Sequence, residues 1–207
     1  MKRVHAVVVT YNRKVLLQEC IEAILKQSVS VEKLILIDNN STDGTPEFLR
    51  ENGYMSNPVI EYIKLDKNIG GAGGFHEGMK KAREYQPDWV WIMDDDTVPT
   101  ETCLEELLNA SEQIKGKVSF LASAVRGMNN EAMNVPKIAR NQFSKYTDWY
   151  EYLDKSMAKI VKATFVSLLI NIEAINQCGL LWKEFFLWGD DSEYTQRIIR
   201  DYGPAYM

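Results

Sequence analysis

Three consecutive aspartates, Asp94, Asp95 and Asp96, follow the apolar run DWVWIM. Adjacent carboxylates repel each other unless a cation or hydrogen-bond donors compensate their charge. Alternate residues of an extended chain point the same way, so Asp94 and Asp96 can share one oxygen-preferring metal ion, Mg²⁺ or Mn²⁺. A solvated acidic turn that caps the next helix is the alternative. The position directly after a strand favours the metal site.

The segment NIGGAGG, residues 68–74, contains four glycines between a predicted strand and a predicted helix. Glycines let backbone amides approach a phosphate or a sugar closely. The segment matches neither G-x-G-x-x-G nor a P-loop. Taken alone, a helix entry that needs positive φ is the stronger interpretation. The donor-side candidates here are Asn68, Gly70, Gly71, Gly73 and Gly74.

Polar residues also follow the first two apolar runs of the chain. Asp38 precedes Asn39, Asn40, Ser41, Thr42 and Asp43. We expect Ser41 or Thr42 to cap the next helix, which leaves the Asp38 carboxylate to accept a hydrogen bond from a base. The residues after the first run, Thr10, Asn12 and Arg13, are candidates of the same kind, with simple turn and capping chemistry as an equal alternative.

A second acidic group lies in WGDDSEY, residues 188–194. A carboxylate beside an apolar wall and other charges can act as a general base, and the candidates are Asp190, Asp191 and Glu193. Acidic residues favoured by the helix dipole are the alternative, which weighs at least as much for Glu193.

The hydrophobic pattern predicts the elements that position these groups. Continuous apolar runs predict buried strands at 4–10, 34–37, 60–65, 88–93, 118–125 and 163–170. Apolar residues at helical spacing predict helices at 17–25, 45–52, 74–85, 101–114 and 190–201. Alternating strands and helices predict an α/β fold, Rossmann-like, with a mainly parallel sheet flanked by helices. Ligands of such sheets bind at the carboxyl ends of the strands, where the polar groups lie.

Two stretches do not follow this pattern. Residues 126–162 are predicted to form a flexible loop or lid that helps to choose the acceptor. After the last helix we expect a Gly-Pro turn and no closing element, so the chain is interpreted as one domain, 1–207, that lacks its C-terminal part.

Composition excludes several classes of protein. The 207 residues are 45% hydrophobic and 26% charged, which is typical of one globular core. A formal net charge of −5 argues against binding nucleic acid through its phosphates. Three separated cysteines favour a reducing compartment, and no run is long enough to span a bilayer, so a cytoplasmic location is expected.

Five segments, in the order in which they occur along the chain, resemble the motifs of family 2 glycosyltransferases with the nucleotide-sugar (GT-A) fold. They are VVVTYNR, LILIDNNSTDGT, NIGGAGGF, WIMDDDT and WGDDSEY. Each segment is weakly specific, whereas the ordered set is strongly specific. Within the family they are most similar to UDP-galactofuranose transferases, with bacterial rhamnosyltransferase-like enzymes next.

The resemblance implies roles for the donor side of a single nucleotide-sugar-binding domain. Thr10 and Asp38 would hold uracil, with Asn12 and Arg13 nearby. Asn68 and residues 70–74 would line the ribose or sugar, which Asp95 would also face. Asp94 and Asp96 would bind Mn²⁺ or Mg²⁺ at the diphosphate of a UDP-sugar.

The resemblance also implies an inverting transfer. Asp191, the second Asp of the D-D-x-E run, would be the base that deprotonates a glycan or glycolipid acceptor in cell-surface polysaccharide synthesis. Acceptor contacts would come from Trp188, Asp190 and Glu193, and less strongly from Trp182. Family members usually supply a further metal ligand, a histidine, just beyond the segment with which this sequence ends. The parent protein would bind peripherally at the inner face of the plasma membrane.

Three other functions are compatible with parts of the pattern. A rhamnosyltransferase that uses a dTDP-sugar is the first. A non-catalytic nucleotide-sugar-binding module is favoured by the lack of a histidine after His76. A nucleotidyltransferase ranks last, because TYNRKVLLQ does not resemble a basic glycine-rich triphosphate loop.

Overall fold

A nine-stranded sheet forms the centre of the computed structural model, which describes residues 2–140 and 148–207. Its strand order is β3-β2-β1-β4-β10-β5-β11-β9-β8. The strands are β1 (Val4–Thr10), β2 (Lys33–Asp38), β3 (Ile60–Lys64), β4 (Trp89–Asp94), β5 (Phe120–Ala122), β8 (Lys137–Ile138), β9 (Lys159–Lys162), β10 (Leu168–Asn171) and β11 (Ala205–Tyr206). The short strands β6 (Val125–Arg126) and β7 (Ala132–Met133) pair separately.

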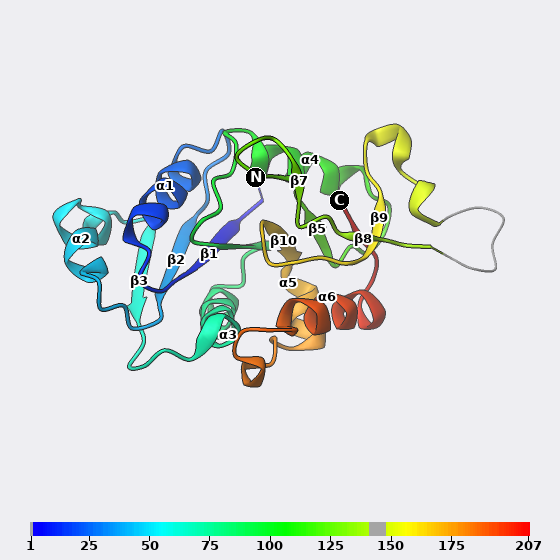
Figure 1. The fold of residues 1–207 in the computed structure, drawn as a ribbon. Helices are drawn as coiled ribbons and strands as arrows, with labels where there is room; N and C mark the ends of the chain where they lie inside the picture. Colours follow the sequence, from blue (N-terminus) through cyan, green and yellow to red (C-terminus); the bar gives the residue numbers. More distant parts are fainter. Residues whose placement is uncertain (1, 141–147) are drawn as a thin grey trace.

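Helices cover both faces of the sheet (Figure 1). One face carries α1 (Lys14–Leu25), α2 (Thr45–Glu51) and α4 (Cys103–Gln113). The other carries α3 (Gly70–Glu84), α5 (Ile172–Cys178) and α6 (Asp190–Asp201). Four 3-10 turns complete the elements: η1 (Tyr54–Ser56), η2 (Asp148–Tyr150), η3 (Leu153–Lys155) and η4 (Lys183–Phe185). The prediction of an α/β fold with a sheet flanked by helices is confirmed.

The strands that carry the polar groups are parallel and in register. β1 pairs in parallel with β2 and with β4, so that Thr10 lies opposite Asp38 and Val9 lies opposite Asp94. β3 extends the parallel part beyond β2, whereas β10 is antiparallel to both β4 and β5. The carboxyl ends of the first four strands therefore lie at one edge.

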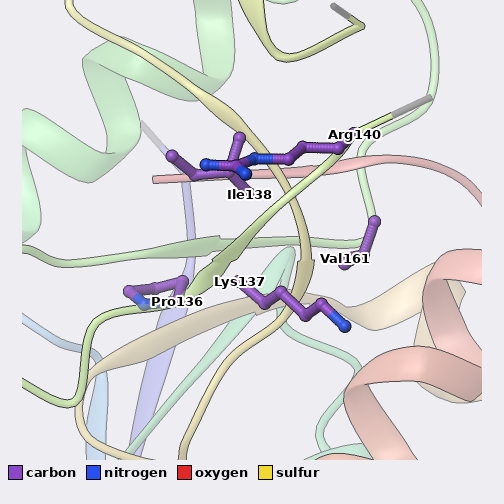
Figure 2. Close-up of a pocket in the computed structure, with 5 residues that line it drawn as sticks. All are labelled: Pro136, Lys137, Ile138, Arg140 and Val161. Carbon is purple, nitrogen blue, oxygen red and sulfur yellow. The ribbon is translucent and has the colours of Figure 1, made fainter. Parts of the chain in front are cut away.

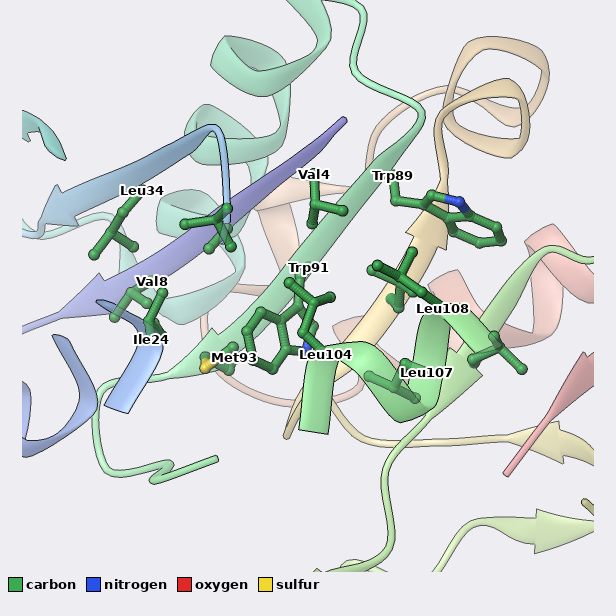
Figure 3. Close-up of a cluster of buried hydrophobic side chains, with 14 of the residues drawn as sticks. Val4, Val8, Ile24, Leu34, Trp89, Trp91, Met93, Leu104, Leu107 and Leu108 are labelled. Carbon is green, nitrogen blue, oxygen red and sulfur yellow. The ribbon is translucent and has the colours of Figure 1, made fainter. Parts of the chain in front are cut away.

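The central strands are buried on both faces, as their continuous apolar runs predict. All seven residues of β1 are buried. On the face covered by α1 and α4, Trp91 packs with Val8, Ile24 and Leu104 in one apolar cluster (Figure 3). The Trp91 indole N–H donates to Ser167 Oγ at 3.0 Å, so the polar atom of this buried side chain is paired. This packing fixes β4, and with it the position of the aspartates that follow.

Several predicted boundaries are wrong. The helix predicted at 74–85 begins at Gly70, so the glycines lie inside α3. The strand predicted at 163–170 is observed as β10 (Leu168–Asn171), which begins five residues later and follows Ser167 with φ 60°. The sequence pattern did not predict α5 or β11. We expected no closing element after the Gly-Pro turn, whereas β11 follows it and lies between β5 and β9 in the sheet.

The stretch 126–162 contains ordered elements where a loop or lid is predicted. β8 and β9 pair with each other and form one end of the main sheet. They border a pocket of about 730 Å³ lined by Pro136, Lys137, Ile138, Arg140 and Val161 (Figure 2). The part of the predicted lid at 141–147 lies outside the described residues. β8 is five strand positions from β4, so this pocket is separate from the aspartate cluster.

Within residues 2–140 and 148–207, none of the helices has the length and apolar character needed to span a bilayer. The three cysteines are free thiols, with Cys20 buried.

His5 makes stability depend on pH. Its side chain is fully buried in β1, and Nε2 lies 3.1 Å from Glu32 Oε2. Nδ1 has no hydrogen-bond partner within residues 2–140 and 148–207. Burial lowers the pKa of His5, and the Glu32 carboxylate opposes this only in part. Below a pH of about 6.5 the unfolded chain therefore binds a proton that the folded chain resists, so this group's contribution to stability falls as pH falls. We expect urea unfolding to show that the free energy of unfolding falls more between pH 7.5 and pH 5.5 for the wild type than for His5→Gln. An equal fall for both proteins would contradict this.

Candidate active site

The aspartates after β4 meet residues that follow β1. The Thr10 hydroxyl donates to Asp95 Oδ2 at 2.7 Å. The Arg13 guanidinium lies 3.0 Å from Asp96 Oδ2 and 3.4 Å from Asp95 Oδ1. Thr10 and Asp95 are buried, whereas Arg13 and Asp96 are exposed. The structure thus brings together predicted donor-side and metal-site residues from two strands.

The charge of this cluster is only partly compensated. Burial, followed by the charges of Asp96 and Asp95, raises the pKa of Asp94 to about 7, and Arg13 opposes this. The charge of Asp190, at the start of α6, also raises the pKa of Asp94 and is the smallest of these contributions. Burial raises the pKa of Asp95 and of Asp190 as well. A cluster of buried carboxylates with raised pKa values is typical of sites that bind a cation or a proton.

The oxygen donors fit a hard divalent ion. Among the described residues, no three His, Cys, Asp or Glu side chains gather as a closed metal site. Mg²⁺ is commonly held by one or two carboxylates together with substrate phosphates. Asp94 and Asp96 would provide such an open set.

Asp38 is placed at the same edge, but its carboxylate is already engaged. The side chain is fully buried, Oδ1 accepts from the Ser41 N–H at 2.7 Å, and Oδ2 accepts from the Tyr62 hydroxyl at 2.6 Å. Base recognition by Asp38 stays a prediction. Sequence reasoning missed Tyr62; its pairing opposite Leu36, two residues before Asp38, places it beside the carboxylate once the register of β3 is known.

The turn after β2 is held by a different residue from the one predicted. Asp43 Oδ1 accepts from the Thr45 N–H at 3.1 Å, so Asp43, and not Ser41 or Thr42, bonds to the first turn of α2. Ser41 Oγ instead accepts from the Asn12 N–H at 2.9 Å, and Asn12 Oδ1 accepts from the Thr42 N–H at 2.7 Å. The Asn12 side chain therefore joins the turns after β1 and β2.

Asn68 and Asn39 fix the entrance of α3. Asn68 Oδ1 accepts from the Gly70 N–H at 2.8 Å. Asn39 Nδ2 donates to the Gly70 carbonyl at 2.8 Å, and its Oδ1 accepts from the Ile69 N–H at 3.2 Å. From the sequence, Asn39 is only one member of the polar cluster after Asp38. Its position directly after a strand is the feature that could have indicated its contacts with the start of α3.

Most glycines of this segment make room for protein atoms. Gly70 has φ 77°, and a Cβ there would lie 2.1 Å from the Phe186 carbonyl oxygen. A Cβ at Gly73 or Gly74 would lie 2.5 Å from Ile69 and 2.4 Å from Val9, respectively. Gly70 therefore allows the chain to enter α3, and Gly73 and Gly74 allow α3 to pack closely. Contact of this segment with the sugar donor stays a prediction.

Alanine substitutions should separate these positions. Gly74→Ala is expected to lower the free energy of unfolding by about 1–3 kcal/mol because its methyl group overlaps Val9. Gly71→Ala is the matched control: its Cβ meets only Leu187 Cδ1 at 4.0 Å, so no loss is expected. Urea unfolding of both variants measures the difference, and equal stabilities would contradict the packing role.

The acidic residues of α6 have three different environments. Asp190 is buried, whereas Asp191 is half-buried and its Oδ1 accepts from the Ser192 hydroxyl at 2.9 Å. Both Glu193 oxygens contact Arg197, at 2.6 and 3.0 Å. Trp188, just before the helix, is 83% exposed. The structure therefore leaves Asp191 partly accessible and Trp188 exposed, buries Asp190, and engages Glu193 within its own helix.

Sequence comparison gives relatives with a named activity. Residues 6–183 match the profile of the family described as Glycosyl transferase family 2. The chain is 37% identical over 202 residues to galactofuranosyltransferase GlfT1 of Mycobacterium tuberculosis, covering 95% of this chain and 64% of that protein. It is 27% identical over 200 residues to GlfT1 of Mycolicibacterium smegmatis, covering 94% and 65%. The chain thus spans about two thirds of the length of these relatives.

Solved structures share the fold. GalNAc-T7 with UDP, GalNAc and Mn²⁺ is similar with a TM-score of 0.76 at 14% identity, over 100% of this chain and 42% of that chain. TarS 1-349 of S. aureus with UDP gives 0.72 at 16%, over 99% and 57%. The mannosyltransferase PcManGT of Pyrobaculum calidifontis with GDP-Man and Mn²⁺ gives 0.65 at 21%, over 99% and 54%. These likenesses confirm the predicted GT-A fold. The match of the family profile to residues 6–183 shows that the chain belongs to glycosyl transferase family 2.

Proposed function

We propose that this chain is the catalytic part of an inverting, metal-dependent glycosyltransferase that uses a UDP-sugar, with galactofuranose the favoured sugar. The observation that carries the proposal is the contact of Asp95 and Asp96 with Thr10 and Arg13 at the edge of the sheet where Asp94 ends β4. The likeness to GlfT1 supports the sugar, and the UDP and Mn²⁺ named with structural neighbours support the nucleotide and the metal.

The chain's own residues divide the work between donor and acceptor. Asp94 and Asp96 would hold Mn²⁺ or Mg²⁺, which when bound neutralises charge on the departing diphosphate. Arg13, which is exposed beside Asp96, adds positive charge at the same place. Thr10 orients Asp95 through its hydroxyl and so presents that carboxylate to the ribose or sugar.

Asp191 is the proposed base. Its carboxylate is accessible at the first turn of α6, next to the buried Asp190. It would take the proton of the acceptor hydroxyl as that oxygen attacks the anomeric carbon from the face opposite the diphosphate, which inverts the configuration. The exposed Trp188 offers a flat apolar face on which an acceptor sugar can stack.

The proposed setting is the synthesis of cell-surface polysaccharide from a glycan or glycolipid acceptor. We propose a cytoplasmic site of action, with peripheral association of the whole protein at the inner face of the plasma membrane. The exposed apolar residues Phe186, Leu187 and Trp188 beside the site are compatible with a lipid-linked acceptor.

Turnover with a panel of donors tests the proposal. The protein is incubated with UDP-galactofuranose, UDP-glucose or dTDP-rhamnose, a glycolipid acceptor and Mn²⁺, and the product's anomeric configuration is determined. We expect transfer from UDP-galactofuranose with inversion, and loss of transfer in chelator. Preference for dTDP-rhamnose would favour the rhamnosyltransferase alternative. Nucleotide binding without turnover of any donor would favour the non-catalytic module.

A further inference from the structure

The segment between α5 and α6, residues 179–189, presents an unusual group of apolar side chains to solvent. Trp182, Phe186, Leu187 and Trp188 are each more than half exposed. We call this segment the aromatic loop. Its two ends are glycines in the left-handed region, Gly179 with φ 79° and Gly189 with φ 91°. A loop with so few buried apolar side chains needs other contacts to keep one conformation.

On one side the aromatic loop is attached to α3, which it approaches in the fold (Figure 1). The Phe186 carbonyl accepts from the Ala72 N–H at 3.1 Å, and Phe186 itself has φ 60°. The Leu181 carbonyl lies 2.8 Å from His76 Nδ1. The first N–H groups of a helix have no partner within the helix. In α3 the loop supplies a partner for one of them, the Ala72 N–H.

On the other side Arg197 of α6 holds the aromatic loop. Its Nη1 donates to the Cys178 carbonyl at 2.5 Å and its Nη2 donates to the Leu180 carbonyl at 3.1 Å. The guanidinium also lies 5.2 Å from the centre of the Trp182 ring. Arg197 is only 9% exposed, so these contacts form in a largely dry environment.

Glu193 orients this guanidinium. Its two oxygens accept from Nε at 2.6 Å and from Nη2 at 3.0 Å, one turn before Arg197 on the same helix. A planar guanidinium can serve a carboxylate, two carbonyls and an aromatic ring at once, whereas a lysine ammonium lacks this fork geometry. The pair thus links the start of α6, which carries Asp190 and Asp191, to the loop that contacts α3.

We propose that Arg197, oriented by Glu193, is a positioning residue that keeps the aromatic loop in place for the acceptor. This rests on the proposed function. Loosening the loop would displace Trp188 and Phe186 relative to Asp191 and weaken acceptor binding. We expect binding at the uracil and metal side to stay unchanged, because Thr10, Arg13 and Asp94 contact elements other than the loop.

Hydrogen exchange tests the positioning without relying on activity. In Arg197→Met we expect exchange of the Ala72 amide, on a different helix, to accelerate by about tenfold or more, because the loop carbonyl that pairs with it is no longer held. Trypsin cleavage after the exposed Lys183 should accelerate in the same way. Arg200→Met is the matched control, since Arg200 lies on the same helix and pairs only with the exposed Asp201 among the described residues. Unchanged exchange at Ala72 in Arg197→Met would overturn the proposal.

Kinetics separate positioning from general stability. We expect the acceptor KM of Arg197→Met to rise about tenfold with UDP affinity unchanged. Equal losses for donor and acceptor would indicate a structural role and contradict the proposal. Arg197→Lys and Glu193→Gln give the same test if Arg197→Met does not fold; both should show faster Ala72 exchange. If the wild type transfers no sugar, the proposed function fails, while the exchange comparison still decides the role of Arg197.

Discussion

Replacing Asp94 and Asp96 together by asparagine is expected to weaken Mn²⁺-dependent binding of UDP by a factor on the order of 100 or more and to abolish transfer. Asparagine keeps the size of each side chain and removes the charge that would hold the cation, whose stabilisation of a diphosphate is worth several kcal/mol. The pKa of Asp94, raised to about 7 by burial and by its acidic neighbours, indicates that Arg13 compensates the negative charge here only in part. Calorimetric titration with UDP, with Mn²⁺ or with chelator, measures the effect.

The matched control is Asp154→Asn, which removes a carboxylate from an exposed position in η3. It should leave the titration unchanged. UDP affinity of the wild type that is insensitive to chelator would remove the metal from the proposal. A double variant that still binds UDP only with Mn²⁺ would show that residues other than Asp94 and Asp96 hold the ion.

Asp191→Asn is expected to lower the rate of transfer by about 10²–10⁴-fold and to leave UDP affinity intact. The substitution removes the group that accepts the proton of the acceptor hydroxyl. The expected loss equals the typical contribution of a general base to the rate. The half-buried Asp191 carboxylate bonds to Ser192, and no contact with the Asp94–Asp96 cluster is seen among the described residues. Single-turnover transfer assays combined with UDP titration measure the two quantities.

Asp190→Asn distinguishes the two neighbouring carboxylates. Asp190 is buried and its charge contributes to the raised pKa of Asp94, so its replacement should act on metal and UDP binding. If Asp190→Asn instead loses transfer with UDP binding unchanged, while Asp191→Asn remains active, the base is Asp190 and our assignment is wrong.

The parallel part of the fold was predictable because its signals are local. Residues 4–10 and 34–37 are continuous apolar runs that end at a polar residue, and such runs form strands buried on both faces. The alternation with helices then required parallel pairing, which brings the carboxyl ends together. The contact of Thr10 with Asp95 follows from this topology.

Other features depend on contacts between distant segments. The glycines of residues 70–74 alone favoured a helix entry over a ligand loop, and only the contacts with Val9, Ile69 and Phe186 show which atoms occupy the space beside them. Asp38 looked free because its partner Tyr62 belongs to the next strand, and only the register of β3 places the two side chains together. The short strand β11 has two residues and therefore no periodicity of its own.

The position of β11 has a consequence for biosynthesis. This strand pairs with β5 on one side and with β9 on the other. During translation, β5 and β9 therefore leave the ribosome before β11, the strand that joins them, has emerged. The first four strands of the sheet can associate while the chain is still growing, whereas the other end must wait for residues 205 and 206. Until then the edge of β9 that pairs with β11 has no partner strand, and an unpaired strand edge is a place where chains can associate and aggregate.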